Sequence, residues 1–237
     1  MRINKYIADS GLCSRRQADR LVEQGDVTIN SVKASPGDRV MPGDTVLVDG
    51  KPLKKRDDTV WIALNKPEGI ECSADSSVRN VIDYVSYPSR IFYVGRLDKD
   101  SRGLLLLTND GDTADRIARA RYGHEKEYLV TLDRPYGPGF VNRMEHGVVI
   151  LDGIKTRHCR VSPVDEKTFS IIITQGLNRQ IRRMCEALGY RVKRLERTRV
   201  MNITLDGIEY GKWRELTAAE VEELTKTADR KAGGKNG

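Results

Sequence analysis

The first fifty residues combine helical and alternating patterns that predict a small mixed module. Apolar side chains recur at helical spacing over residues 3–7 and again over 18–22. Ser14 and Gln17 have the spacing of a capping box, so the second helix is expected to begin directly after Ser14. Two short apolar runs follow between Pro-Gly-Asp turns, and they predict strands at 27–30 and 45–48.

The pattern changes near residue 59, where longer apolar segments predict a larger sheet. The expected strands are rich in aliphatic and aromatic residues and lie at 60–64, 91–94, 104–107, 128–132 and 169–174. Helical spacing predicts helices over 113–120 and 180–188. Because strands outnumber helices and do not alternate regularly with them, an α+β fold is expected.

Composition divides the chain into a small and a large domain. Residues 51–58 are polar and contain a proline, which predicts a linker between a domain over 1–50 and a domain over 59–225. The last stretch, 226–237, is rich in lysine, glycine and other small or polar residues. It is expected to be disordered.

The 237 residues carry a formal net charge of +7, much of it in one segment. Between residues 175 and 199, eight lysines and arginines stand against two glutamates, which favours a nucleic-acid footprint over an evenly solvated surface. No apolar run could cross a bilayer and the start lacks a signal-peptide core, so a cytoplasmic protein without a membrane partner is expected. The four cysteines and three histidines are scattered, without metal-ligand spacing.

Basic side chains gather on two parts of the predicted helices. A candidate RNA-docking surface lies opposite the apolar face of the N-terminal helices, with a solvated helix face as the alternative; it consists of Lys5, Arg15, Arg16 and Arg20. The first turn of the 180–188 helix holds three cations that oppose the helix dipole: Arg179, Arg182 and Arg183. An anionic partner would offset that repulsion, and Arg179 and Arg183 are candidate RNA contacts. An exposed pair between Arg182 and Glu186 is the alternative.

The segment 94–111 places a cluster of both charge signs directly before four leucines. Its aspartates and glycine match three positions of an EF-hand calcium loop, but Arg102 and Asn109 stand where calcium ligands are needed. An exposed hairpin loop suits most of these charges. It suits Asp98 less well, because Leu97 and the leucines that follow hold that position near the core.

Five motifs, in order along the chain, resemble those of the RsuA-like ribosomal RNA pseudouridine synthases. The segments 95–98 and 101–111 are similar to the family's catalytic-aspartate motif. The other four are a turn at 65–69, a tyrosine motif at 126–128, a basic motif at 176–184 and a C-terminal signature at 211–216. The first fifty residues resemble an S4 RNA-binding domain. Residues 185–216 most resemble the RluF subgroup, which acts on 23S ribosomal RNA.

The resemblance implies an α+β fold in which a small S4 domain precedes a pseudouridine synthase domain. That larger domain is expected to have a mixed, mainly antiparallel sheet flanked by helices. The implied reaction converts uridine to pseudouridine in ribosomal RNA, with 23S RNA as the expected partner and tRNA open as a second substrate. Substrate and product are isomers, so no cofactor or metal is implied, and a monomer is the default expectation.

The resemblance also implies roles for individual residues. Asp98 is expected to act on the sugar of a flipped-out uridine, either as a nucleophile or as the base that removes the C2′ proton. Arg182 is expected to pair with Asp98 in a largely dry pocket and keep it ionised. Arg96 is expected to fill the space that the flipped base leaves, and Tyr128 to stack on the base.

One departure from the family and two competing functions follow from the same residues. Asn30-Ser31 stands where S4 domains often have Asn-Gly, so a differently shaped turn is expected there. The main competing function is a catalytically silent, S4-containing assembly factor, which would have no need of Asp98. A DNA-binding regulator would use a recognition helix, and the long β-rich second half argues against it.

Overall fold

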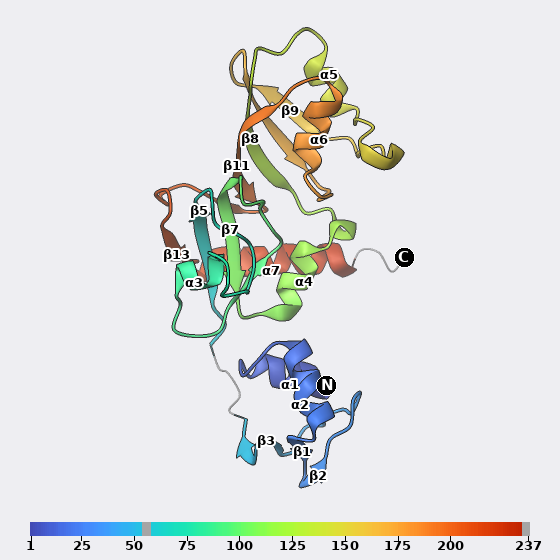
Figure 1. The fold of residues 1–237 in the computed structure, drawn as a ribbon, viewed down its shortest axis with the longest axis vertical. Helices are drawn as coiled ribbons and strands as arrows, with labels where there is room; N and C mark the ends of the chain where they lie inside the picture. The colour runs from blue at the N-terminus through green and yellow to red at the C-terminus, as the bar shows by residue number, and fades with distance from the viewer. Residues whose placement is uncertain (54–57, 234–237) are drawn as a thin grey trace. The chain divides into compact units, whose positions relative to one another are not determined.

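The computed structural model describes residues 1–53 and 58–233. The chain divides into two compact units, and Figure 1 labels many of the helices and strands of both. The first unit consists of Met1–Val60 with short segments at 87–91 and 109–111, and the second holds the remainder of the chain. Within the described residues, no helix is long and apolar enough to cross a membrane.

The first unit contains two helices and a four-stranded antiparallel sheet in the order β2-β1-β3-β4. Its elements are α1 (Ile3–Asp9), α2 (Arg15–Gln24), β1 (Val27–Ile29), β2 (Val32–Lys33), β3 (Val46–Val48) and β4 (Lys51–Pro52). Both helices share one apolar core with the sheet, formed mainly by Ile3, Ile7, Ala18, Val22, Val27, Val46 and Val48. The predicted helices and strands of this region are therefore present.

The predicted capping box starts α2. The Gln17 backbone N–H donates to Ser14 Oγ at 3.2 Å, and the Ser14 N–H donates to Gln17 Oε1 at 2.9 Å. Two backbone donors that the first helical turn leaves unpaired are thus satisfied by side chains. Gly25, with φ of 82°, then ends the helix in the left-handed conformation.

The turn between β1 and β2 differs from the expectation for Asn30-Ser31. Both residues have positive φ, 50° and 68°, and the register pairs Ile29 with Val32 across a two-residue loop. The backbone keeps the conformation that a two-residue hairpin turn favours, although serine stands where glycine is usual. The Asn30 side chain supports it, because its Oδ1 accepts from the Thr45 N–H at 2.9 Å and its Nδ2 donates to Asp44 at 2.8 Å.

The second unit is built on a nine-stranded sheet in the order β13-β5-β7-β11-β8-β10-β9, with β6 paired to β7 and β12 to β11. The strands are β5 (Trp61–Lys66), β6 (Phe92–Val94), β7 (Arg102–Thr108), β8 (Lys126–Leu132), β9 (Arg160–Pro163), β10 (Thr168–Ile173), β11 (Val192–Val200), β12 (Ile203–Thr204) and β13 (Trp213–Glu215). Among the described residues, only β7 and β11 pair in parallel. The sheet is mixed and mainly antiparallel, as predicted.

Five α-helices and two 3₁₀ turns lie in the described part of this unit. They are α3 (Val81–Val85), α4 (Gly111–Ala118), α5 (Phe140–Glu145), α6 (Gln180–Ala187) and α7 (Ala218–Gly233), with 3₁₀ turns at Ala120–Tyr122 and Leu151–Gly153. The predicted helices over 113–120 and 180–188 correspond to α4 and α6. The sequence patterns missed α3, α5 and α7, which are short or only weakly periodic.

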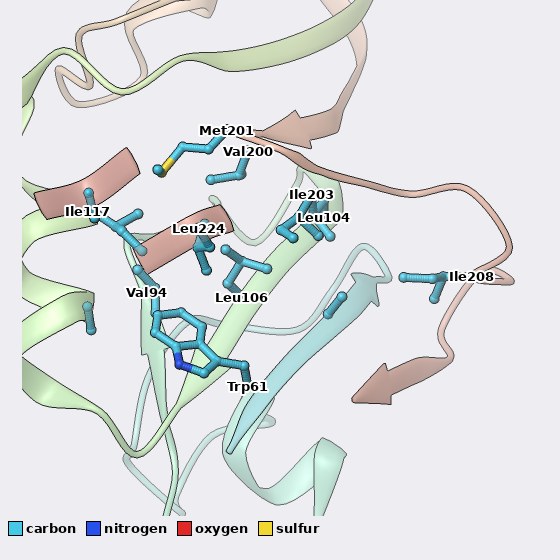
Figure 2. Packing of buried hydrophobic residues seen from close by; sticks show 13 residues of the cluster. Trp61, Val94, Leu104, Leu106, Ile117, Val200, Met201, Ile203, Ile208 and Leu224 are labelled. Carbon is cyan, nitrogen blue, oxygen red and sulfur yellow. The ribbon is translucent and has the colours of Figure 1, made fainter. Parts of the chain in front are cut away.

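The four leucines after the charged cluster form the centre of β7 and are buried on both faces of the sheet. Leu104 and Leu106 belong to a cluster with Trp61, Val94 and residues of α4 and α7, and Figure 2 shows Leu224 and Ile117 against it. Leu105 and Leu107 lie on the other face and are completely buried. Burial on both faces explains why this strand is continuously apolar rather than alternating.

The helix α7 corrects the expectation of a disordered tail over 226–237. Residues 226–233 are helical, and both Leu224 and Ala228 are fully buried in the cluster of Figure 2. Arg116 on α4 pairs with Asp229 at 3.0 Å and ties the helix further. The sequence pattern did not predict this helix because its composition is mostly polar and only one narrow side of it is apolar. Residues 234–237, and 54–57 of the predicted linker, lie outside the described residues.

An aromatic cluster holds α5 and the end of α6 against the sheet. Phe140 on α5 packs on Phe169 of β10 with ring centroids 5.3 Å apart, and on Tyr190, directly after α6, at 5.0 Å. Because Tyr190 follows α6 and leads into β11, this cluster holds the C-terminal end of α6 against the sheet. The N-terminal turn, at the opposite end of the helix, carries the basic motif of the sequence.

Candidate active site

Asp98 lies in the loop that connects β6 to β7. The Ser101 N–H donates to the Asp98 carbonyl at 3.1 Å and closes a turn, and the Gly69 N–H donates to the next carbonyl, that of Lys99, at 2.8 Å. The loop is therefore tied to the turn at 65–69, a second family-like motif. A side-chain pair at 3.0 Å between Lys99 and Glu71 strengthens this connection.

The turn at 65–69 is organised by a buried lysine. Lys66, at the end of β5, has no exposed surface, and its Nζ donates to the carbonyls of Pro67 and Ile70, both at 2.9 Å. Burial lowers the pKa of Lys66 below its ordinary value. Because the Lys66 ammonium binds carbonyls on the inner side of the turn, the Gly69 N–H on the outer side is free to bind the Asp98 loop.

A cavity of about 740 Å³ lies between this turn and the Asp98 loop. Its lining includes Arg96, Asp98, Glu71, Cys72, Tyr93 and Arg179. That volume is within the range of pockets that hold small organic ligands. A second cavity of about 480 Å³ adjoins it, shares Asp100 and Arg179, and adds Arg182, Glu186 and Arg191.

Arg179 is the cation that pairs with Asp98. The distance from its Nη1 to Asp98 Oδ2 is 3.5 Å, and 33% of the Asp98 side chain is exposed. The expected pair between Asp98 and Arg182 in a dry pocket is therefore wrong in both respects. An ion pair this exposed contributes about 0–1 kcal/mol, so its main effect is on the orientation of the carboxylate.

Arg182 instead holds the backbone of the same loop. Its side chain is 8% exposed, and its Nη2 donates to the Asp100 carbonyl at 2.9 Å and to Ser101 Oγ at 3.1 Å. Its Nη1 donates to the Val192 carbonyl at 3.3 Å. Arg182 lies on the buried side of α6 with Ile181 and Cys185, which explains why it meets backbone rather than the exposed Asp98 carboxylate.

Asp100, rather than the expected Asp98, is the anion that both Arg179 and Arg182 contact at this helix turn. Arg179 donates to its two carboxylate oxygens at 3.3 Å each, and Arg182 Nη2 lies 3.4 Å from Oδ2. Partial burial would raise the pKa of Asp100, but the hydrogen bond from Arg179 and the charges of both arginines outweigh it. The pKa therefore lies below its ordinary value. The alternative interpretation, an exposed pair between Arg182 and Glu186, is not among the ion pairs of the described residues.

The structure does not bring Tyr128 to the Asp98 cavity. Tyr128 lies on β8, 8% exposed, with Ile171 and Arg197 as its partners on the neighbouring strands. It is absent from the described residues that line the two cavities. The aromatic residue of the larger cavity is Tyr93 on β6. Only its place shortly before Asp98 in the sequence could have signalled it.

The remaining basic candidates differ in their exposure and in their side-chain partners. On α2, Arg15, Arg16 and Arg20 are exposed, as the docking surface requires. Lys5 pairs with Asp9 at 2.6 Å within α1, and Arg183 donates to Asn178 at 3.0 Å. The N-terminal candidates therefore offer three exposed cations on one helix.

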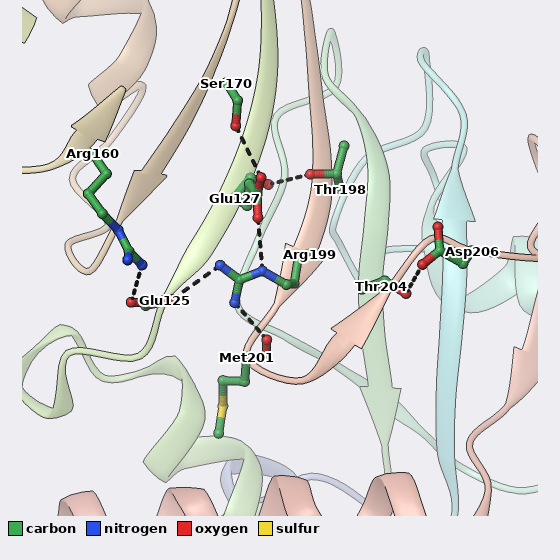
Figure 3. Close-up of polar contacts among 9 residues, drawn as sticks. All are labelled: Glu125, Glu127, Arg160, Ser170, Thr198, Arg199, Met201, Thr204 and Asp206. Atoms are coloured by element: carbon green, nitrogen blue, oxygen red, sulfur yellow. Dashed lines mark hydrogen bonds and ion pairs between the residues drawn. The ribbon is translucent and has the colours of Figure 1, made fainter. Parts of the chain in front are cut away.

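Only part of the basic segment 175–199 lies on the protein surface. Its second half is the central strand β11, in which Arg197 is 2% exposed. Arg199 pairs with Glu125 at 3.1 Å and with Glu127 at 2.9 Å, in the polar network of Figure 3 that also includes Arg160. The footprint interpretation is therefore wrong for these two arginines, since the local charge count could not show that β11 buries Arg197 and places Arg199 beside two glutamates.

Comparison with known proteins decides the family. Residues 60–187 match the family model described as RNA pseudouridylate synthase, and residues 1–46 match the model of the S4 domain. The chain belongs to the RNA pseudouridylate synthase family. The predicted resemblance and enzyme class are confirmed, and the S4 domain is confirmed with them.

Individual relatives of this pseudouridine synthase are similar over most of their length. The chain is 52% identical over 229 residues to "Dual-specificity RNA pseudouridine synthase RluF" of Escherichia coli K12, covering 95% of this chain and 79% of that protein. It is 36% identical to "Ribosomal large subunit pseudouridine synthase B" of Bacillus subtilis, covering 99% and 98%. A solved structure, "Crystal structure of pseudouridylate synthase", superposes with a TM-score of 0.71 at 30% identity over 94% of this chain and 99% of that one.

The geometry of this pseudouridine synthase suits a reaction that needs one carboxylate. Asp98 offers a partly exposed carboxylate in a cavity, beside the fixed positive charge of Arg179. Cys72 lies in the same wall, where its Sγ accepts a hydrogen bond from the Leu97 N–H at 3.3 Å and burial raises its thiol pKa. The thiol is therefore protonated at neutral pH, and Asp98 is the stronger candidate for the reacting group.

Proposed function

We propose that this enzyme isomerises a specific uridine of 23S ribosomal RNA to pseudouridine, with Asp98 as the group that reacts. Two similar proteins carry names that support the substrate class, since one is called a ribosomal large subunit synthase and the other a dual-specificity RNA synthase. The second name makes a second RNA substrate worth testing, and tRNA is the one that the sequence analysis left open. The observation that carries the proposal is the Asp98 carboxylate in the 740 Å³ cavity, paired with Arg179.

The reaction requires one carboxylate that is correctly oriented towards the sugar of the target uridine. The N1–C1′ bond breaks, the uracil turns, and a C5–C1′ bond forms while C5 loses a proton and N1 gains one. Asp98 can attack the sugar and be released again, or remove the C2′ proton and return it. Both routes leave the carboxylate unchanged at the end. Arg179 supports either route because it fixes the direction of the Asp98 oxygens.

The target base must leave its stack before Asp98 can reach the sugar. Arg96 lies two residues before Asp98, lines the same cavity and is exposed, so its side chain can extend into the space that the base vacates. Tyr128 stays a candidate for stacking on the base. Tyr93 is favoured by its position, because it already lines the cavity and an aromatic face there would meet the uracil directly.

The S4 domain supplies the second RNA contact in this proposal. Arg15, Arg16 and Arg20 lie exposed on α2, and such cations bind phosphates without reading the sequence. Arg179 and Arg183 would contact RNA near the cavity. Recognition is thus divided between phosphate binding by the small domain and base capture by the large one.

The test is a modification assay on unmodified 23S RNA fragments, mapped by carbodiimide-blocked primer extension. Wild type is expected to create one new stop, and Asp98→Asn to abolish it while RNA binding persists. Asp75→Asn is a matched control, because Asp75 is an exposed carboxylate in the turn after the cavity wall and hydrogen-bonds only to nearby residues. A wild-type protein that binds RNA without creating any stop would favour the silent assembly factor instead.

A further inference from the structure

Arg197 is a buried cation without a carboxylate partner. It lies on β11 with 2% of its surface exposed, and no ion pair of the described residues includes it. Burying a guanidinium without a counter-ion is costly, and apolar side chains of similar size generally serve stability better in such places. The presence of Arg197 at the centre of the sheet therefore indicates a role other than packing.

The contacts of Arg197 are the two ends of the Asp98 loop. Its Nε donates to the carbonyl of Leu104 at 2.6 Å, and its Nη1 donates to the carbonyl of Arg96 at 3.4 Å. Arg96 precedes Asp98 by two residues, and Leu104 follows it inside β7. One planar side chain therefore joins the strand entering the loop to the strand leaving it, which a single-donor side chain could not do.

The same position joins the two halves of the large sheet. β7 and β11 pair in parallel only at Arg102 with Glu196 and at Gly103 with Arg197. A Cβ on Gly103 would lie 2.4 Å from the Arg197 carbonyl oxygen, so the two backbones are as close as glycine allows. The Arg102–Glu196 ion pair, at 2.7 Å, lies at the neighbouring step. The loop that holds Asp98 is thus built on this junction.

From these contacts we infer that Arg197 is a positioning residue for the Asp98 loop. It sets the separation of the loop's two ends at the sheet junction and thereby the direction in which the carboxylate faces the sugar. The inference rests on the proposed function of Asp98, and it adds a residue from a different strand that is not itself among the described residues lining the two cavities. Small displacements of a reacting group are enough to slow a reaction substantially while leaving substrate affinity in place.

The experiment separates rate from affinity in three variants of the full chain. Arg197→Lys keeps the charge but ends in a single nitrogen, so it cannot place donors at both the Nε and the Nη1 positions of the planar guanidinium. Arg197→Met removes the charge at similar volume. Arg199→Lys is the matched control, because Arg199 lies two residues further along β11 and pairs with Glu125 and Glu127, not with the loop. Single-turnover rates at saturating enzyme, RNA dissociation constants and melting temperatures are measured for each.

Both Arg197 variants are expected to slow the single-turnover rate by about 100-fold while the dissociation constant changes by no more than about twofold. Arg199→Lys is expected to keep its rate even if it melts earlier. A folded Arg197→Lys or Arg197→Met with the wild-type rate would overturn the inference. So would a rate loss that merely follows the melting temperature across all three variants. If Asp98→Asn itself retained activity, the proposed function would fail first, which distinguishes the two failures.

Discussion

Arg182 and Asp100 form an ion pair whose two members should differ strongly in their effect on stability. The Arg182 side chain is 8% exposed and that of Asp100 is 51% exposed. Truncating Arg182 to alanine removes donors from Ser101 Oγ and from the carbonyls of Asp100 and Val192. Ser101 is completely buried, so its hydroxyl loses a partner that water cannot easily replace.

The expected magnitudes follow from that asymmetry. Each buried polar group left without a partner costs about 1–3 kcal/mol, so the loss at Ser101 and Val192 predicts about 2–6 kcal/mol for Arg182→Ala. Asp100→Asn removes only a half-exposed charge, which is worth no more than about 1 kcal/mol. The arginine should therefore cost several times as much stability as the aspartate, although both belong to the same pair.

Urea unfolding followed by tryptophan fluorescence measures this difference in the free energy of unfolding of the second unit. The chain has two tryptophans, Trp61 and Trp213, and both lie in the second unit. Arg182→Lys serves as a control that keeps the charge and one or two of the hydrogen bonds, so an intermediate loss is expected. Equal losses for Asp100→Asn and Arg182→Ala would refute the argument that backbone hydrogen bonds, rather than the charge pair, carry the stabilisation.

Two further predictions concern the S4 domain and the pH dependence of stability. Arg15→Ala with Arg16→Ala should weaken RNA binding and reduce the slope of log K against log salt by about 1.4–1.8, because each phosphate contact contributes about 0.7–0.9. An unchanged slope would mean that α2 does not face RNA. The hydrogen bond from Arg214 lowers the pKa of Glu220 from 4.5 to about 2. A carboxyl with a lowered pKa stabilises the fold above its ordinary pKa, and that contribution is lost as the pH falls from 4.5 towards 2. Glu220→Gln should therefore lower the urea midpoint at pH 7 and have a smaller effect at pH 3, and a constant difference would contradict the assignment.

Much of the local structure could be predicted because it depends on nearby residues. The capping box of Ser14 and Gln17 is complete within four residues, and the apolar run of β7 marks a strand buried on both faces. The order of the family-like motifs likewise indicated the enzyme class. The missed elements are those with weak local patterns, such as the helix α7, whose burial is confined to one side.

The partners within the site could not be predicted in the same way. Arg179 and Arg182 occupy the same turn of α6, and nothing in their spacing says which one meets Asp98. The answer depends on how α6 lies against the Asp98 loop once the sheet has assembled. Arg197 lies about a hundred residues after Asp98, so its nearness to the loop exists only once β7 and β11 pair. Tyr93 is close to Asp98 in the sequence, but its place in the cavity wall depends on the pairing of β6 with β7.

By itself, then, the sequence indicated the S4 and synthase domains, many of the helices and strands, and Asp98 as the candidate reacting group, since those are carried by short ordered patterns. Only the tertiary structure decided which arginine faces that aspartate, which aromatic ring lines its cavity and which buried cation joins the ends of its loop. Hydrogen bonds and ion pairs require atoms within a few ångströms, and for residues a hundred positions apart that proximity is a property of the packed sheet.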